Sequence, residues 1–230
     1  MLSIEAYAAD GVVSYEIHRF RRRHRIRLVH RRIHRMPEQL SLPGLDVPRR
    51  PTDRLFFALI PGTGAAARIA QCSQHLRRKH RLTGRPIATE RLHITLHFID
   101  DYAGLPPRIV AAVSEAVATV AIPPFDLTLD RARSFCENRP LNRPFVLIPS
   151  DDNPALSALQ RAVGAAMTKA NIGKPAVRHF TPHLTLLYDD RCLEEHAIET
   201  IAWTAREFVL VHSPLGRSRH VPLARWTLRA

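Results

Sequence analysis

The chain has 230 residues, 45% of them hydrophobic, and its formal net charge at pH 7 is +13. This size suits one large domain or two small lobes around a packed core, and the lack of any apolar run as long as a membrane-spanning helix argues against a helical membrane protein. The basic balance favours a polyanion such as nucleic acid as partner, although a GC-rich genome explains the abundance of Arg equally well.

Residues 1–50 differ from the rest of the chain. From His18 to Met36 there are nine Arg and four His. A basic run of this kind is usually solvated or disordered, so we predict a disordered extension ahead of a domain at 51–230. Two other interpretations stay open. The run is an RNA-binding arm that follows phosphates, or residues 1–35 lie upstream of a true start at Met36.

The next elements alternate between strand and helix. Residues 54–60 form a short, continuous apolar run typical of a buried strand, and residues 64–80 have helical periodicity. A loop at 83–90 leads into a strand at 91–99. The same order of strand, helix and strand returns over residues 144–188, which predicts a duplicated α+β unit.

The remaining elements follow from turn signals and apolar patterns. We predict helices at 107–121 and 151–170, and strands at 125–133, 145–148, 182–188, 203–212 and 219–229. Residues 190–199 are polar, with room for a short helical turn. The last two strands are expected to pair antiparallel. In the loop between them, Arg217, Arg219 and His220 are within reach of RNA, but a basic loop is more often only solvated.

Three cysteines, Cys72, Cys136 and Cys192, form neither an even disulfide framework nor a close metal-binding spacing. We therefore expect free thiols in a reducing cytoplasm. The N-terminus lacks the charged and then apolar pattern of a signal peptide. Nothing in the sequence calls for a metal or an organic cofactor.

Two of the predicted strands carry the same pattern of His, apolar residue and Thr: His93 with Thr95, and His183 with Thr185. Alternate side chains of a strand share a face, so each His and Thr point together while the apolar neighbours face the core. We expect the two strands to face each other across a cleft. By the same alternation His97 lies on the face of His93. We expect its side chain to be partly exposed there, beyond the position of a phosphate bound between the two motifs.

This set of side chains suits phosphodiester chemistry. One imidazole can take a proton while the other, still charged, gives one. A Thr hydroxyl can donate a hydrogen bond to a phosphate oxygen. The chemistry is in-line displacement without a metal, which depends on positioning and charge stabilisation. One copy of so short a motif is a weak signal, but two copies in similar strands are much stronger.

The chain resembles the two-histidine phosphoesterase superfamily, specifically the bacterial RNA 2',3'-cyclic phosphodiesterases once called 2'-5' RNA ligases. The resemblance runs from about Arg54 to about Leu228 and includes residues 54–61, both His-x-Thr strands, and residues 143–147 and 178–186. It implies an α+β, bilobal fold with two pseudo-symmetric lobes of antiparallel sheet, helices outside and a cleft between them.

The resemblance also implies a reaction and a site. Members open 2',3'-cyclic phosphate ends of RNA, typically leaving a 2'-phosphate, with no metal. His93 and His183 would be the acid/base pair, and Thr95 and Thr185 would bind phosphate oxygens. Arg178 would reach a phosphate or the 3' side of the substrate, unless it forms a surface or lobe-bridging ion pair. The expected partner is an RNA or oligonucleotide with a cyclic phosphate end, bound by a monomer away from membranes.

The chain departs from the family pattern at three places. Residues 98–101 lack the Gly that often follows the first motif, Leu187 and Tyr188 stand where an Arg often follows the second, and residues 216–220 replace a Gly-x-Tyr. Other activities stay open: a phosphodiesterase for 2'-5' linked oligonucleotides or a cyclic nucleotide metabolite, reversible 2'-5' ligation at the same site, or an RNA-binding module without turnover.

Overall fold

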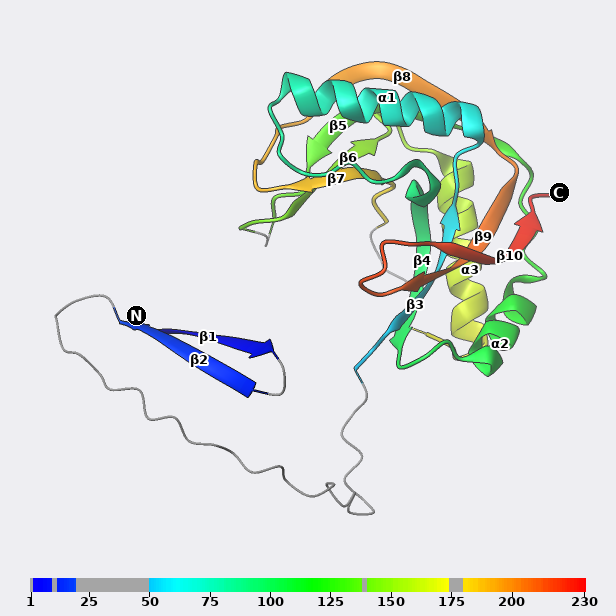
Figure 1. Ribbon diagram of the computed structural model, residues 1–230. Coiled ribbons are helices and arrows are strands. Elements are labelled where there is room, and N and C mark those ends of the chain that lie inside the picture. Colours follow the sequence, from blue (N-terminus) through cyan, green and yellow to red (C-terminus); the bar gives the residue numbers. More distant parts are fainter. Residues whose placement is uncertain (1, 10–11, 20–49, 138–139, 174–179) are drawn as a thin grey trace, which may run out of the picture. The chain divides into compact units, whose positions relative to one another are not determined.

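The computed structural model describes residues 2–9, 12–19, 50–137, 140–173 and 180–230 (Figure 1). It divides into two units, residues 1–46 and residues 47–230.

The smaller unit contains an antiparallel pair of strands, β1 (Leu2–Ala9) and β2 (Val12–Arg19). The sequence pattern predicts no strand there. The basic segment at residues 20–36 lies outside the described residues, so the disordered extension and its alternatives stay predictions.

The larger unit is an α+β structure, as predicted. Its elements in chain order are β3 (Asp53–Leu59), α1 (Thr63–Lys79), the short 3₁₀ helix η1 (Thr89–Arg91), β4 (Ile94–Tyr102), α2 (Pro107–Val117), β5 (Phe125–Ser134), β6 (Arg143–Ile148), α3 (Pro154–Lys169), β7 (Leu184–Asp189), β8 (His196–Ala205), β9 (Glu207–Pro214) and β10 (Val221–Thr227). No helix among the described residues is long and apolar enough to cross a membrane.

The eight strands form one antiparallel sheet in the order β10-β9-β3-β4-β7-β6-β5-β8. A single register pair, Ile94 with Leu184, joins β4 to β7 in the middle. The sheet therefore consists of two four-stranded halves, each with one motif strand at the junction. The strand pairs of the predicted duplication, β3–β4 and β6–β7, occupy corresponding places in the two halves. Their helices are exchanged, since α1 packs on β7 and β8 and α3 packs on β4 and β5.

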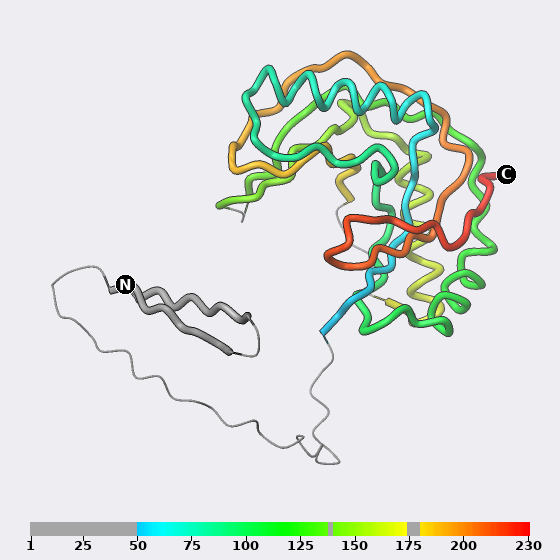
Figure 2. Tube along the Cα trace, viewed as in Figure 1, coloured from blue at the N-terminus to red at the C-terminus, as the bar shows by residue number. Residues whose placement is uncertain are grey.

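The helices cover the sheet on its core side. Figure 1 shows α1 along the half that contains β5 to β8, and α2 and α3 against the half that contains β3 and β4. The continuous apolar run of β3 is explained by burial on both faces. Leu55, Phe57 and Leu59 enter the main core, and Phe56 and Ala58 enter a small cluster with β9. Figure 2 shows the orange and red β9–β10 hairpin returning beside β3.

Edge strand β8 is a strand of the large sheet that the sequence pattern misses. A polar segment at 190–199 and a single strand at 203–212 are predicted, but β8 and β9 are separate strands that meet at Arg206. An edge strand needs little apolar surface, and within β8 only Ile201 and Ala205 are buried. Its polar composition therefore hides the strand.

Both motif strands contain a β-bulge directly after the motif Thr. On β4, Thr95 pairs with Ala58 and His97 pairs with Phe57, which leaves Leu96 as the extra residue. A bulge shifts the alternation of side chains by one residue. The prediction that His97 is partly exposed on the face of His93 is therefore wrong: His97 is 5% exposed and points into the core.

The bulge on β7 is equivalent. Thr185 pairs with Val146 and Leu187 pairs with Phe145, so Leu186 is the extra residue. Leu186 and Leu187 are both fully buried, although they are neighbours in a strand. The next residue, Tyr188, therefore returns to the face of Thr185.

Candidate active site

All four motif residues predicted from the sequence line one cavity of about 460 Å³: His93, Thr95, His183 and Thr185. They meet because each His directly precedes the residue of the register pair that joins the halves, Ile94 or Leu184. The cavity lies at this junction, on the side of the sheet opposite the main core. The structure thus brings together two imidazoles and two hydroxyls from two motifs that are ninety residues apart, from His93 to His183.

The two imidazoles are held in the same way. His93 Nδ1 lies 2.7 Å from the carbonyl oxygen of Arg91, and His183 Nδ1 lies 2.8 Å from that of Thr181. A carbonyl oxygen can only accept, so each Nδ1 carries the proton and donates it. This leaves Nε2 of each ring as the nitrogen for proton exchange with a ligand.

The surroundings of His93 are aromatic and buried. Its ring centre lies 5.0 Å from that of Phe56 and 4.9 Å from that of His220. Burial lowers the pKa of His93 below its ordinary value and outweighs the opposing hydrogen bond to Arg91, and nearby His183 lowers it further. The His93 imidazole is therefore neutral at pH 7 before an anionic ligand arrives.

His220 lines the wall of the cavity, whereas the sequence places it in a basic loop that either contacts RNA or, more often, is only solvated. Burial, followed by charge repulsion from His93 and Arg91, lowers the pKa of His220 to about 3. Its ring also meets Phe56 edge to face, with centres 5.4 Å apart. No local pattern marks His220 as a site residue, because its place depends on the β9–β10 hairpin folding back beside β3.

A different aromatic ring contacts the second motif. The ring of Phe135 meets that of His183 edge to face at 5.0 Å, and the guanidinium of Arg133 lies 5.6 Å from the centre of the Phe135 ring. Phe135 directly follows β5. Each motif imidazole is therefore packed against a Phe from its own half of the sheet.

Arg178 lies outside the described residues, so its predicted contact with substrate stays a prediction. Two other cations line the cavity, Arg54 and Arg91. Arg54 makes two hydrogen bonds of 2.8 Å to the carboxylate of Asp101 and lies 5.3 Å from the centre of the Phe98 ring. Arg54 and Arg91 therefore give the cavity a positively charged lining even without a contribution from Arg178.

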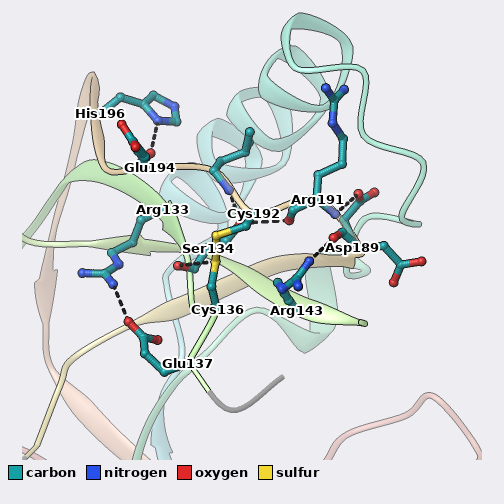
Figure 3. Close-up of a disulfide and its surroundings, with 12 residues drawn as sticks. Arg133, Ser134, Cys136, Glu137, Arg143, Asp189, Arg191, Cys192, Glu194 and His196 are labelled. Carbon is teal, nitrogen blue, oxygen red and sulfur yellow. Dashed lines mark hydrogen bonds and ion pairs between the residues drawn. A yellow bond between two sulfur atoms is a disulfide. The ribbon is translucent and has the colours of Figure 1, made fainter. Parts of the chain in front are cut away.

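The expectation of three free thiols is wrong for two of them. Cys136 and Cys192 form a disulfide (Figure 3), and their Cα atoms are 5.9 Å apart. Cys72 is free. The sequence separation of 56 between the paired cysteines conceals the pairing. The segments after β5 and β7 meet through backbone contacts, including a 2.9 Å hydrogen bond from the amide of Ser134 to the carbonyl of Leu193.

Breaking this disulfide is expected to destabilise the fold. Cys192→Ser should lower the free energy of unfolding by about 2–4 kcal/mol, because the unfolded chain loses the constraint of a long closed loop. Urea denaturation with and without reductant measures the loss, and Cys72→Ser serves as the matched control that keeps the bridge. Alkylation of the denatured protein should label one cysteine before reduction and three after it. Three labelled cysteines without reductant would contradict the pairing.

Comparison with known proteins places the chain among RNA-processing phosphoesterases. Residues 63–218 match the model of the 2'-5' RNA ligase superfamily. The chain is 31% identical over 182 residues to the RNA 2',3'-cyclic phosphodiesterase of Escherichia coli strain K12, covering 76% of this chain and 96% of the relative.

Solved structures agree with this match. The crystal structure of E. coli LigT complexed with 3'-AMP is similar with a TM-score of 0.63 and 28% identity, over 79% of this chain and all of that one. The protein TT0787 of Thermus thermophilus, at 18% identity and a TM-score of 0.62, shares the fold over 77% of this chain and 98% of its own. The predicted two-histidine phosphoesterase fold is confirmed.

Proposed function

The chain belongs to the 2'-5' RNA ligase superfamily, and from this premise we propose that it hydrolyses 2',3'-cyclic phosphate ends of RNA to 2'-phosphates. The observation that carries the proposal is the meeting of two His-x-Thr motifs, with matching Nδ1 anchors, in one cavity. The E. coli relative is an RNA 2',3'-cyclic phosphodiesterase, which supports the same substrate.

The reaction needs one proton removed and one supplied. A water oxygen attacks the phosphorus while the bond from phosphorus to O3' breaks on the opposite side. The Nε2 of one motif His takes a proton from the water, and the Nε2 of the other gives a proton to O3'. The product has a 2'-phosphate monoester and a free 3'-hydroxyl.

The threonines act on the charge of the phosphate. The hydroxyls of Thr95 and Thr185 donate hydrogen bonds to the two non-bridging oxygens, on which negative charge increases as water attacks. Each Thr follows its His by two residues on one strand face. The strand therefore sets the spacing between the imidazole, which exchanges the proton, and the hydroxyl, which binds the phosphate oxygen.

Burial sets the starting state of His93. Because burial lowers the pKa of His93, this imidazole can accept a proton as soon as substrate binds. It can donate one only after the negative phosphate has raised its pKa. The pH dependence of kcat/KM therefore assigns its role: a limb below pH 6.5 that rises with pH identifies a base, and one that falls identifies an acid.

The test is incubation of the protein, in EDTA, with a short RNA ending in a 2',3'-cyclic phosphate. We expect complete conversion to the 2'-phosphate, identified by chromatography against 2'- and 3'-phosphate standards. A second reaction offers a 5'-hydroxyl oligonucleotide in place of water as nucleophile, which reports 2'-5' ligation at the same site. Loss of activity in EDTA with recovery on added divalent metal would refute the metal-independent mechanism. Cleavage of a 2'-5' linked dinucleotide alone would refute the substrate.

We further propose that the protein acts as a monomer in the cytoplasm. A single chain supplies both imidazoles and both hydroxyls of the cavity, so the proposed chemistry needs no second subunit. The disulfide is the observation against this location, because cytosolic proteins rarely hold disulfides. Alkylation of thiols in intact cells, before lysis, reports whether Cys136 and Cys192 are paired there.

A further inference from the structure

The Cys136–Cys192 disulfide lies next to the second motif. Cys136 directly follows Phe135, the residue whose ring contacts His183, and Cys192 follows the end of β7. The bridge therefore joins the segment after β5 to the segment after the second motif strand (Figure 3). A covalent bond that reduction can open is thus one residue away from a ring that packs on a motif imidazole.

The backbone at Phe135 is held on both sides along the chain. Before it, the amide of Ser134 donates a 2.9 Å hydrogen bond to the carbonyl of Leu193, and the amide of Phe135 itself donates one of 2.9 Å to the carbonyl of Pro144. After it comes the bridge of Cys136. The disulfide is therefore the covalent tether on the side of Phe135 where the chain leaves β5.

The Phe135 ring lies between two side chains. Its centre is 5.0 Å from that of the His183 ring, edge to face, and the guanidinium of Arg133 lies over it at 5.6 Å. Arg133 also donates a 3.0 Å hydrogen bond to Glu137 and forms an ion pair of 3.8 Å with Glu195. This cation thus contacts both of the segments that the disulfide joins, and it packs the Phe135 ring against His183.

Packing matters at His183 because one hydrogen bond does not fix a ring. The 2.8 Å contact between His183 Nδ1 and the Thr181 carbonyl holds one nitrogen, and the imidazole can still pivot about it. His93 packs against two rings, and His183 packs against that of Phe135. A displacement of ~1 Å in a reacting group can lower a rate ~100-fold, so the contact that places His183 Nε2 affects the chemical step.

From this geometry we propose that Phe135 is a positioning residue for His183 and that the Cys136–Cys192 disulfide holds Phe135 in place, so that the thiol–disulfide state of the bridge controls the rate of the reaction. The inference rests on the proposed function, because it takes His183 as a proton-transfer group. It adds a redox-controlled modification site to the second half of the sheet.

Reduction is a balanced exchange with a dithiol. The dithiol supplies two electrons and two protons, the bond between the two Sγ atoms breaks, two protein thiols form, and the dithiol leaves as its own disulfide. Cys192 is exposed whereas Cys136 is half-buried, so the incoming thiolate attacks the sulfur of Cys192. Disulfides that occur in the cytosol are usually transient and catalytic or redox-sensing. A reducing compartment therefore gives a slower enzyme, and oxidation raises kcat.

The test compares the oxidised protein with protein reduced by dithiothreitol, on a short RNA with a 2',3'-cyclic phosphate end. Reduction should lower kcat ~10-fold with KM unchanged, because Thr95 and Thr185 still bind the phosphate. Phe135→Ala should lower kcat at least as much with the bridge intact, and reductant should have no further effect on it. Phe135→Tyr keeps the ring and should keep both the wild-type kcat and its response. Cys72→Ser, which retains the bridge, is the matched control.

A second variant removes the bridge without reductant. The double change of Cys136→Ser and Cys192→Ser should have the kcat of the reduced wild type under both conditions. Circular dichroism at the assay temperature reports whether each variant is folded. Phe135→Ala keeps the bridge and decides the same question where the double variant fails to fold.

Two results would overturn the proposal. One is an equal kcat of the oxidised and the reduced wild type, with both folded. The other is a loss on reduction of Phe135→Ala as large as that of the wild type, which would show that the bridge acts through a different residue.

A spectroscopic measurement separates this inference from the reaction itself. The ring-proton resonances of His183 and His93, identified by their loss in His183→Gln and His93→Gln, require no turnover. Reduction, like Phe135→Ala, should shift the His183 signals, because its ring protons lose the ring current of Phe135, and should leave those of His93 in place. This result in a protein that fails to open cyclic ends would retain the positioning of His183 and reject the proposed function. Unchanged His183 signals in an active protein would reject the inference alone.

Discussion

Alanine at position 93 or 183 is expected to lower kcat for opening a cyclic phosphate end by ~10²–10⁴-fold, the range of general acid–base catalysis. A backbone hydrogen bond at Nδ1 fixes each ring and leaves its Nε2 for the ligand. Neither imidazole can therefore replace the other on the opposite side of the phosphorus. Single-turnover kinetics with His93→Ala and His183→Ala measures the loss of the chemical step. The double variant should lose less than the product of the two single losses, because the residues act as a unit.

A matched control is available on α1. His75 is exposed and does not line the cavity of the motif residues, so His75→Ala should keep full activity. Circular dichroism and thermal melting should show that all three single variants remain folded. Full activity of a folded His93→Ala or His183→Ala variant would refute the two-histidine mechanism.

The sequence predicted the parts of the fold that depend on local pattern. The continuous apolar run at 54–60 and the alternation at 125–133 are properties of short windows, and both predicted strands are present as β3 and β5. The motif residues could be predicted equally well, because a strand keeps His and Thr on one face over the three residues from His93 to Thr95. The bulge begins only after the Thr.

The remaining features depend on which segments meet. A bulge is set by the partner strand, so the burial of His97 and the exposure of Tyr188 could not be derived from alternation in β4 or β7 alone. His220 reaches the cavity through a hairpin, and Cys136 after β5 pairs with Cys192 after β7, although β6 lies between these two strands in the sheet. Each of these is a long-range contact without a short sequence signal.

Asp189, at the end of the second motif strand, is expected to be the most sensitive polar position in the fold. Its carboxylate is buried and accepts hydrogen bonds from three backbone amides, those of Thr83 at 2.6 Å, Gly84 at 2.8 Å and Arg191 at 2.9 Å. Asp189→Ala leaves these amides unsatisfied and should lower the free energy of unfolding by about 3 kcal/mol. Urea denaturation at pH 7 measures the loss.

The same carboxylate makes stability depend on pH. Burial raises the pKa of Asp189, but the hydrogen bonds from Arg191, Gly84 and Thr83 together lower it below the ordinary value of 3.8. A group whose pKa is lower in the folded state stabilises the fold above its unfolded pKa, and this contribution is lost as pH falls through the folded value. Asp189→Asn should therefore remove part of the acid sensitivity below pH 4, whereas Asp152→Asn, at an exposed position, should leave the profile unchanged. A variant with wild-type stability at both pH 7 and pH 4 would show that the loop of Thr83 and Gly84 is held by other contacts.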